Sequence, residues 1–144
     1  MATVDRFSEL IGTVIKSCGM LEFHVNHFIK SLGKDAILVK HVTKLLLNRR
    51  INVLRDLMLD QPELTAPEVN SLCDELEKIA KDRNVVAHNP VVISAQPDGP
   101  KIVDLRSGVS QPKEFAEAEL EAFHKRIWDA ITDLLRLKRK ITSL

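Results

Sequence analysis

The sequence predicts an all-α protein, namely an antiparallel four-helix bundle with a small β-hairpin inserted before the last helix. Two observations carry this prediction. Four segments, at about residues 3–32, 34–60, 66–88 and 112–141, have apolar residues at helical spacing. Two short β-branched runs separate the third segment from the fourth. A length of 144 residues is typical of one domain, so we interpret residues 1–144 as a single helical domain.

The first segment shows the clearest helical pattern. Its apolar residues are spaced by three and four positions throughout and comprise Val4, Phe7, Ile11, Val14, Cys18, Leu21, Val25, Phe28 and Leu32. This stripe predicts one long helix that ends near Gly33, because glycine is a common residue at helix C-termini. Glu22 lies next to the stripe, an unusual place for a carboxylate.

The second and third segments differ in regularity. In the second, the apolar residues change face at Asn48-Arg49-Arg50, where we expect a kink. The third begins at Thr65-Ala66-Pro67-Glu68, which has the pattern of a capping box with proline in the first turn. It should end before Pro90, because the residue preceding a proline is disfavoured in the α region. Its stripe is Val69, Leu72, Leu76, Ile79, Arg83 and Val86, with an arginine where the pattern calls for an apolar residue.

The hairpin is predicted from Val91–Gln96 and Lys101–Arg106, which flank the turn sequence Pro97-Asp98-Gly99-Pro100. The last helix should begin near Pro112 or Lys113. It is acidic at its start and basic at its end, an order that suits the helix dipole.

Composition limits the partners and the cellular location that we expect for this protein. The 21 basic and 20 acidic residues leave a net charge of +1, so any contact with nucleic acid needs a local basic patch. The chain contains no apolar run approaching the roughly 18 residues of a membrane span, so we expect no membrane partner. Cys18 and Cys73 both lie in helical patterns and no secretory signal is visible, which favours a cytoplasmic location.

Arg83 needs a partner if it is buried, because an unpaired guanidinium in a core costs several kcal/mol. Glu22 is the expected partner if the first and third helices are neighbours. That pair could be purely structural, or Arg83 could extend its charged end to solvent. Asn84 and His88 lie about 100° and 140° around the helix from Arg83, on an outward edge.

The run Arg83-Asn84-Val85-Val86-Ala87-His88 resembles the signature of HEPN domains (higher eukaryotes and prokaryotes nucleotide-binding). In that signature an arginine and a polar residue precede a short spacer and a histidine, near the end of a bundle helix. The resemblance implies a compact helical bundle that forms homodimers, with the motifs of two subunits facing one cleft. It also implies a metal-independent endoribonuclease without a cofactor, of a toxin–antitoxin, abortive-infection or CRISPR-associated system. Other family members are inactive and act as binding or scaffold modules.

The resemblance assigns roles to residues of this chain. Arg83 would bind the reacting phosphate, His88 would act as acid or base, Asn84 would orient either group, and Glu22 would hold Arg83. RNA and an antitoxin or other protein partner are implied. Members paired with a minimal nucleotidyltransferase antitoxin carry a tyrosine two residues after the histidine. Proline stands at that position and the chain has no tyrosine, so this arrangement is not expected.

Two weaker patterns leave alternatives open. His24 and His27 could bind a metal with Glu22 or Cys18, but no second ligand pair accompanies them, and we expect surface histidines and no metal. The basic residues Arg136, Lys138, Arg139 and Lys140 could contact an RNA backbone, or could form a solvated helix end. Three hypotheses for the whole chain follow: an endoribonuclease, an inactive HEPN-like binding module, or a dimeric bundle in which Arg83 is structural.

Overall fold

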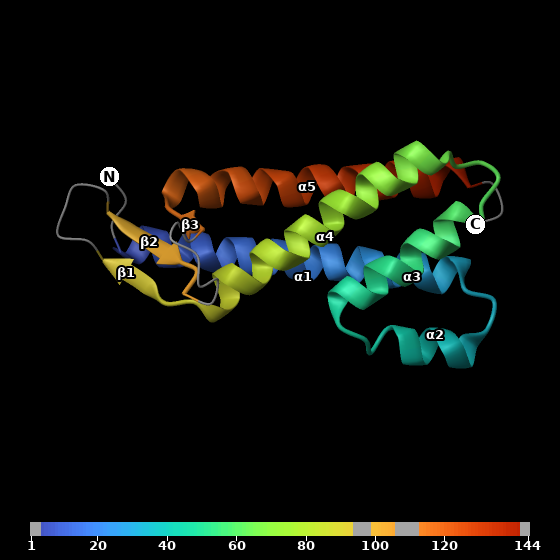
Figure 1. The fold of residues 1–144 in the computed structure, drawn as a ribbon, viewed down its shortest axis with the longest axis horizontal. Coiled ribbons are helices and arrows are strands. Elements are labelled where there is room, and N and C mark those ends of the chain that lie inside the picture. The colour runs from blue at the N-terminus through green and yellow to red at the C-terminus, as the bar shows by residue number, and fades with distance from the viewer. Residues whose placement is uncertain (1–3, 94–98, 106–112, 142–144) are drawn as a thin grey trace.

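A computed structural model describes residues 4–93, 99–105 and 113–141, which form five helices and a small three-stranded sheet (Figure 1). The predominantly helical class predicted from the sequence is confirmed. The helices are α1 (Val4–Leu32), α2 (Ala36–Val42), α3 (Leu47–Leu59), α4 (Ala66–His88) and α5 (Glu117–Lys140). The strands are β1 (Val91–Ile93), β2 (Pro100–Val103) and β3 (Glu114–Phe115).

Helix α1 follows the predicted stripe closely. Its buried residues are Phe7, Val14, Ser17, Cys18, Leu21, Val25, Phe28, Ile29 and Leu32. The helix ends at Gly33, whose N–H donates to the Ile29 carbonyl at 2.8 Å. A Cβ at Gly33 would collide with the side chain of Val39, so the glycine lets α2 fold back against the end of α1.

The second segment forms two helices, and the predicted kink at Asn48-Arg49-Arg50 is wrong. The break comes earlier, at Thr43–Leu46, and Asn48 to Arg50 lie inside α3. Asp35 caps α2 by accepting hydrogen bonds from the N–H groups of Ile37 and Leu38. Because α2 buries none of its side chains, its apolar residues do not extend the face of α3, and the chain reverses between them.

Helix α4 begins and ends where the sequence predicts. Thr65 caps it by accepting a hydrogen bond from the Glu68 N–H at 3.4 Å. At the other end the Asn89 side chain donates to the Val85 carbonyl and accepts from the Leu105 N–H, so it joins the helix end to the segment after β2. The helix therefore has a defined C-terminal end at His88.

The hairpin is confirmed in shorter form, with Val91 paired to Ile102 and Ile93 to Pro100 in antiparallel register. Pro97 and Asp98 of the predicted turn lie outside the described residues, whereas Gly99 has a positive φ of 73° and Pro100 begins β2. The predicted start of the last helix is wrong: Glu114 and Phe115 form β3 beside β2, and α5 begins at Glu117. Phe115 is buried 5.8 Å from the Phe123 ring, so the core holds this segment extended.

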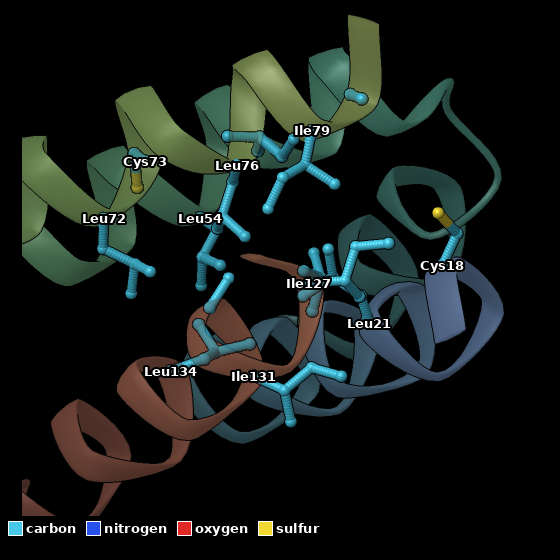
Figure 2. Packing of buried hydrophobic residues seen from close by; sticks show 14 of the residues in the cluster. Cys18, Leu21, Leu54, Leu72, Cys73, Leu76, Ile79, Ile127, Ile131 and Leu134 are labelled. Atoms are coloured by element: carbon cyan, nitrogen blue, oxygen red, sulfur yellow. The ribbon is translucent and has the colours of Figure 1, made fainter. Parts of the chain in front are cut away.

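Helices α1, α3, α4 and α5 supply the helical part of the core, and α2 supplies none of it. Figure 2 shows Leu21, Leu54, Leu76 and Ile127 converging from these four helices. No helix in the described part of the chain has the length and apolar character needed to cross a bilayer.

Helix directions differ from those of a bundle with alternating neighbours. Arg6 contacts Glu117 and His27 contacts Lys138, so the two ends of α1 meet α5 at the same offset of 111 residues. Helices α1 and α5 are therefore parallel, and α4 runs against both (Figure 1). The extra reversal comes from α2, which the sequence pattern did not separate from α3.

Candidate functional site

The three residues of the predicted motif lie on the last turns of α4. Arg83 is half-buried, whereas Asn84 and His88 are exposed. The Arg83 Nη1 lies 3.4 Å from the Asn84 Oδ1, a weak hydrogen bond between neighbours. His88 is the final residue of the helix, beside the segment that leads into β1. The outward placement predicted for Asn84 and His88 is confirmed.

Arg83 and Asn84 border an open cavity of about 660 Å³ between α1, α3 and α4. Its lining is mostly polar or charged and consists of Glu22, Leu45, Leu46, Leu47, Asn48, Arg50, Asn52, Glu77, Ala80, Lys81, Arg83 and Asn84. His88 is absent from this lining. The structure thus brings three of the four predicted residues, Glu22, Arg83 and Asn84, to one cavity and leaves His88 outside it.

The expected ion pair between Glu22 and Arg83 does not form. Glu22 instead accepts from the Arg50 Nη2 at 3.2 Å, and the Asn26 Oδ1 accepts from the Arg50 Nη1 at 2.7 Å. Arg50 is only 8% exposed, so it needs this carboxylate more than Arg83 does. Sequence reasoning missed Arg50, although it stands three residues after Leu47 and four before Leu54, on the buried face of α3.

Arg83 therefore has no carboxylate partner among the described residues, and its buried Nε has no hydrogen-bond partner there. Its charge acts on Cys18 in the core. Burial raises the pKa of the Cys18 thiol to about 11, while the Arg83 charge lowers it and the Glu22 charge raises it. At neutral pH Cys18 is a neutral thiol and supplies no counter-charge. The guanidinium is consequently anchored near the core without an ion pair in the described chain, at a cavity whose two carboxylates, Glu22 and Glu77, are paired with Arg50 and Arg55.

Asp82, the residue before Arg83, is the charged side chain that α4 buries most completely. It is 3% exposed and accepts from Lys113 and from the Arg126 Nη1 at 2.9 Å. Arg126 also donates to Glu75 at 2.9 Å. These contacts join α4 to α5 and to the residue before β3. This network was not predicted from the sequence, because Asp82 and Arg83 fit the spacing of the stripe equally well and Arg83 was taken as the buried charge.

The basic residues at the end of α5 do not face the cavity. They lie at the end of the molecule opposite to the α4 C-terminus (Figure 1). Lys140 pairs with Glu68 at 3.3 Å, Arg136 with Asp133 at 3.5 Å, and the Lys138 Nζ lies 2.7 Å from the His27 Nδ1. Arg139 is exposed and makes no ion pair within the described chain.

The histidines of α1 contact a lysine and an aromatic ring. His27 contacts Lys138, and the Phe23 ring lies 5.4 Å from His24 and 6.0 Å from His27. Burial, His27 and Lys138 all lower the pKa of His24. No group of three or more potential ligands suited to a metal ion is present among residues 4–93, 99–105 and 113–141.

Comparison of the chain with family models, with curated proteins and with solved structures found no match.

Proposed function

We propose that this protein is a HEPN-type, metal-independent endoribonuclease whose site of Arg83, Asn84 and His88 is completed by homodimerisation. Support comes first from the fold, since α1, α3, α4 and α5 share one core and could correspond to a HEPN-like bundle. The resemblance of residues 83–88 to the family signature is the second support. It also suggests a cytoplasmic toxin or phage-defence system, with an antitoxin or another protein as partner.

The observation that carries the proposal is the uncompensated charge of Arg83. A structural arginine in this position would have a carboxylate, and Glu22 is engaged by Arg50 instead. The Arg83 guanidinium borders an open cavity, where an RNA phosphate could supply the missing negative charge. Arginine suits this role because its planar fork binds two phosphate oxygens at once.

The proposed reaction needs a base and an acid. The base removes the proton of the ribose 2′-hydroxyl, and the oxygen attacks the adjacent phosphorus. The bond to the 5′-oxygen of the next nucleotide breaks, and the acid protonates that oxygen. The products carry a 2′,3′-cyclic phosphate and a 5′-hydroxyl. Arg83 would stabilise the charge that develops on the phosphate oxygens, and Asn84 would orient the phosphate or His88.

Dimerisation supplies the second proton-transfer group. One chain offers a single His88, which is exposed at the end of α4 and lies outside the cavity lining. Two subunits meeting at this helix end would bring two imidazoles to one phosphate, one neutral and one protonated. In this arrangement each chain carries half of a site.

One observation favours a second candidate, a catalytically inactive module that binds RNA, a nucleotide or a protein partner. His88 does not line the cavity that Arg83 borders, so a ligand can bind at Arg83 without contacting His88. In an inactive module, replacing His88 would leave ligand affinity and every other measured property unchanged.

A cleavage assay in the presence of a chelator tests the proposal. We expect the wild-type protein to release RNA fragments that end in 2′,3′-cyclic phosphate. His88→Ala and Arg83→Gln should each lower the rate by about 10²–10³-fold, because they remove proton transfer and phosphate stabilisation respectively. His124→Ala is a matched control, because it removes a histidine that belongs to another helix, α5, and does not line the Arg83 cavity. Wild-type activity in the His88→Ala variant would refute the assignment.

A further inference from the structure

One short segment of the described chain carries several basic side chains that have no carboxylate partner there. Ion pairs engage Arg6, Arg50, Arg55, Lys101, Lys113, Lys125, Arg126, Arg136 and Lys140. Among residues 4–93, 99–105 and 113–141, no ion pair is present for Lys34, Lys40, Lys44 or Arg49, all of which lie in residues 34–49. We call this segment, which comprises α2, its flanking connections and the first residues of α3, the elbow.

The elbow also lacks internal compensation. Asp35 is its single carboxylate, and that side chain caps the N–H groups of Ile37 and Leu38. Helix α2 buries none of its side chains, and Ile37 and Leu46 are 70% and 72% exposed. The elbow is therefore a positively charged surface that also presents large apolar side chains, a combination that suits an anionic partner with apolar faces.

The elbow is continuous with the Arg83 cavity. Leu45, Leu46 and Asn48 belong to the cavity lining, together with Lys81 and Arg83 on α4. Lys81 is exposed and, like Arg83, has no carboxylate partner in the described residues. Lys40 and Lys44 precede the lining residues Leu45 and Leu46 in the sequence. The two carboxylates of the lining, Glu22 and Glu77, are paired with Arg50 and Arg55, which leaves Lys81 and Arg83 as its basic side chains without an ion pair in the described chain.

We infer that single-stranded RNA crosses the elbow on its way into the Arg83 cavity, with Lys40 and Lys44 on its phosphates and Leu46 against its bases. This inference rests on the proposed function. A single strand combines a charged backbone with apolar base faces, which matches the composition of the elbow. The basic end of α5 is a poorer surface for the strand, because Lys138 and Lys140 contact His27 and Glu68.

The test measures binding without cleavage, in the His88→Ala background. A short fluorescein-labelled single-stranded RNA is titrated by fluorescence anisotropy at several salt concentrations. Each lysine that contacts a phosphate should contribute about 0.7 to the slope of log affinity against log salt. Lys40→Gln with Lys44→Gln should therefore weaken binding at low salt and flatten the slope by about 1.4. Between about 50 and 200 mM salt, the factor by which this variant binds RNA more weakly than the His88→Ala protein should shrink about sevenfold.

A matched double variant controls for net charge. Lys16→Gln with Lys78→Gln removes two exposed lysines of α1 and α4 that also lack a carboxylate partner in the described chain, but belong neither to the elbow nor to the lining of the Arg83 cavity. We expect this variant to keep the wild-type slope. Leu46→Ser separates the two kinds of contact: affinity should fall while the slope stays unchanged, because apolar contacts release no counterions.

Several results would overturn the inference: no RNA binding by the His88→Ala protein, or equal slopes for the two double variants. It would also be overturned if the elbow variant bound RNA normally but lost binding to vesicles containing phosphatidylglycerol, since the elbow would then be a lipid-binding surface. Failure of the proposed function looks different. In that case RNA binds through the elbow, yet the wild-type protein yields no cyclic phosphate ends.

Discussion

Asp82 and Arg83 are sequence neighbours on α4 whose charges are handled in opposite ways. Asp82 turns towards α5 and β3, is 3% exposed, and accepts from two cationic side chains. Arg83 turns towards the cavity between α1, α3 and α4, and no carboxylate meets it among the described residues. This difference distinguishes a charge that stabilises the fold from a charge that is available to a ligand. A buried charge that is fully paired maintains the fold, whereas an anchored charge left unpaired beside a cavity is available to a ligand.

Asp82→Ala should have the largest effect on stability. Lys113 and Arg126 would lose their shared acceptor, so α4 would lose these contacts with α5 and with the residue before β3, while the pair of Arg126 with Glu75 remains. Both cations are partly exposed and can regain water, so we expect a loss of about 3 kcal/mol, at the lower end for a broken buried pair. Urea unfolding measures this loss. Asp129→Ala, which breaks the exposed pair with Lys125, is the control and should change stability by less than about 1 kcal/mol.

Glu22→Gln should have the next largest effect, because it leaves the buried Arg50 without its carboxylate. We expect a loss of about 2 kcal/mol in the free energy of unfolding, since the amide and Asn26 can still accept hydrogen bonds. Double-mutant cycles identify the partner. Glu22→Gln should be coupled to Arg50→Met and additive with Arg83→Met. If Glu22→Gln and Arg83→Met were coupled by a similar free energy, Glu22 would pair with Arg83, as the sequence predicted.

The pKa of the Cys18 thiol should respond to the charge of Arg83, with a smaller effect than the two losses of stability above. In a Cys73→Ala background, thiolate absorbance should give a pKa for Cys18 of about 11. Arg83→Met should raise this value, because it removes a nearby positive charge, and Glu22→Gln should lower it. The folded pKa lies above the ordinary value of 9.0, so the thiol's contribution to stability is present below pH 9 and is lost as pH rises towards 11. An unchanged pKa in Arg83→Met would place the guanidinium far from Cys18.

The sequence was sufficient for α1 and α4, whose stripes and capping residues define one face and both ends. It was insufficient for the second segment, since two apolar patterns in succession do not show whether the chain bends or reverses. The segment before α5 was misassigned because Ala116 continues the helical spacing of Leu120 and Phe123, and the acidic residues around it suit a helix start. Phe115 was not part of that pattern. Its extended conformation comes from pairing with β2 and from contact with Phe123, both of which are tertiary interactions.

The candidate site was predicted in part for a similar reason. Asp82 stands three residues after Ile79 and four before Val86, whereas Arg83 stands four after and three before. Spacing alone therefore cannot decide which of the two side chains is buried. In the structure Asp82 is buried and Arg83 is half-buried. Arg50 carried the same signal on α3, an arginine at a core position, and it claims Glu22. The pairing of charges depends on helix directions, which the stripe pattern does not contain.

The central claim is that Arg83 serves a ligand and contributes little to the fold. The most direct test is the free energy of unfolding of Arg83→Met, measured in urea without RNA. We predict a change within about 1 kcal/mol, because no ion pair is lost and a buried Nε without a partner is removed. A loss of about 3 kcal/mol or more, comparable to that of Asp82→Ala, would contradict the claim and make Arg83 a structural residue.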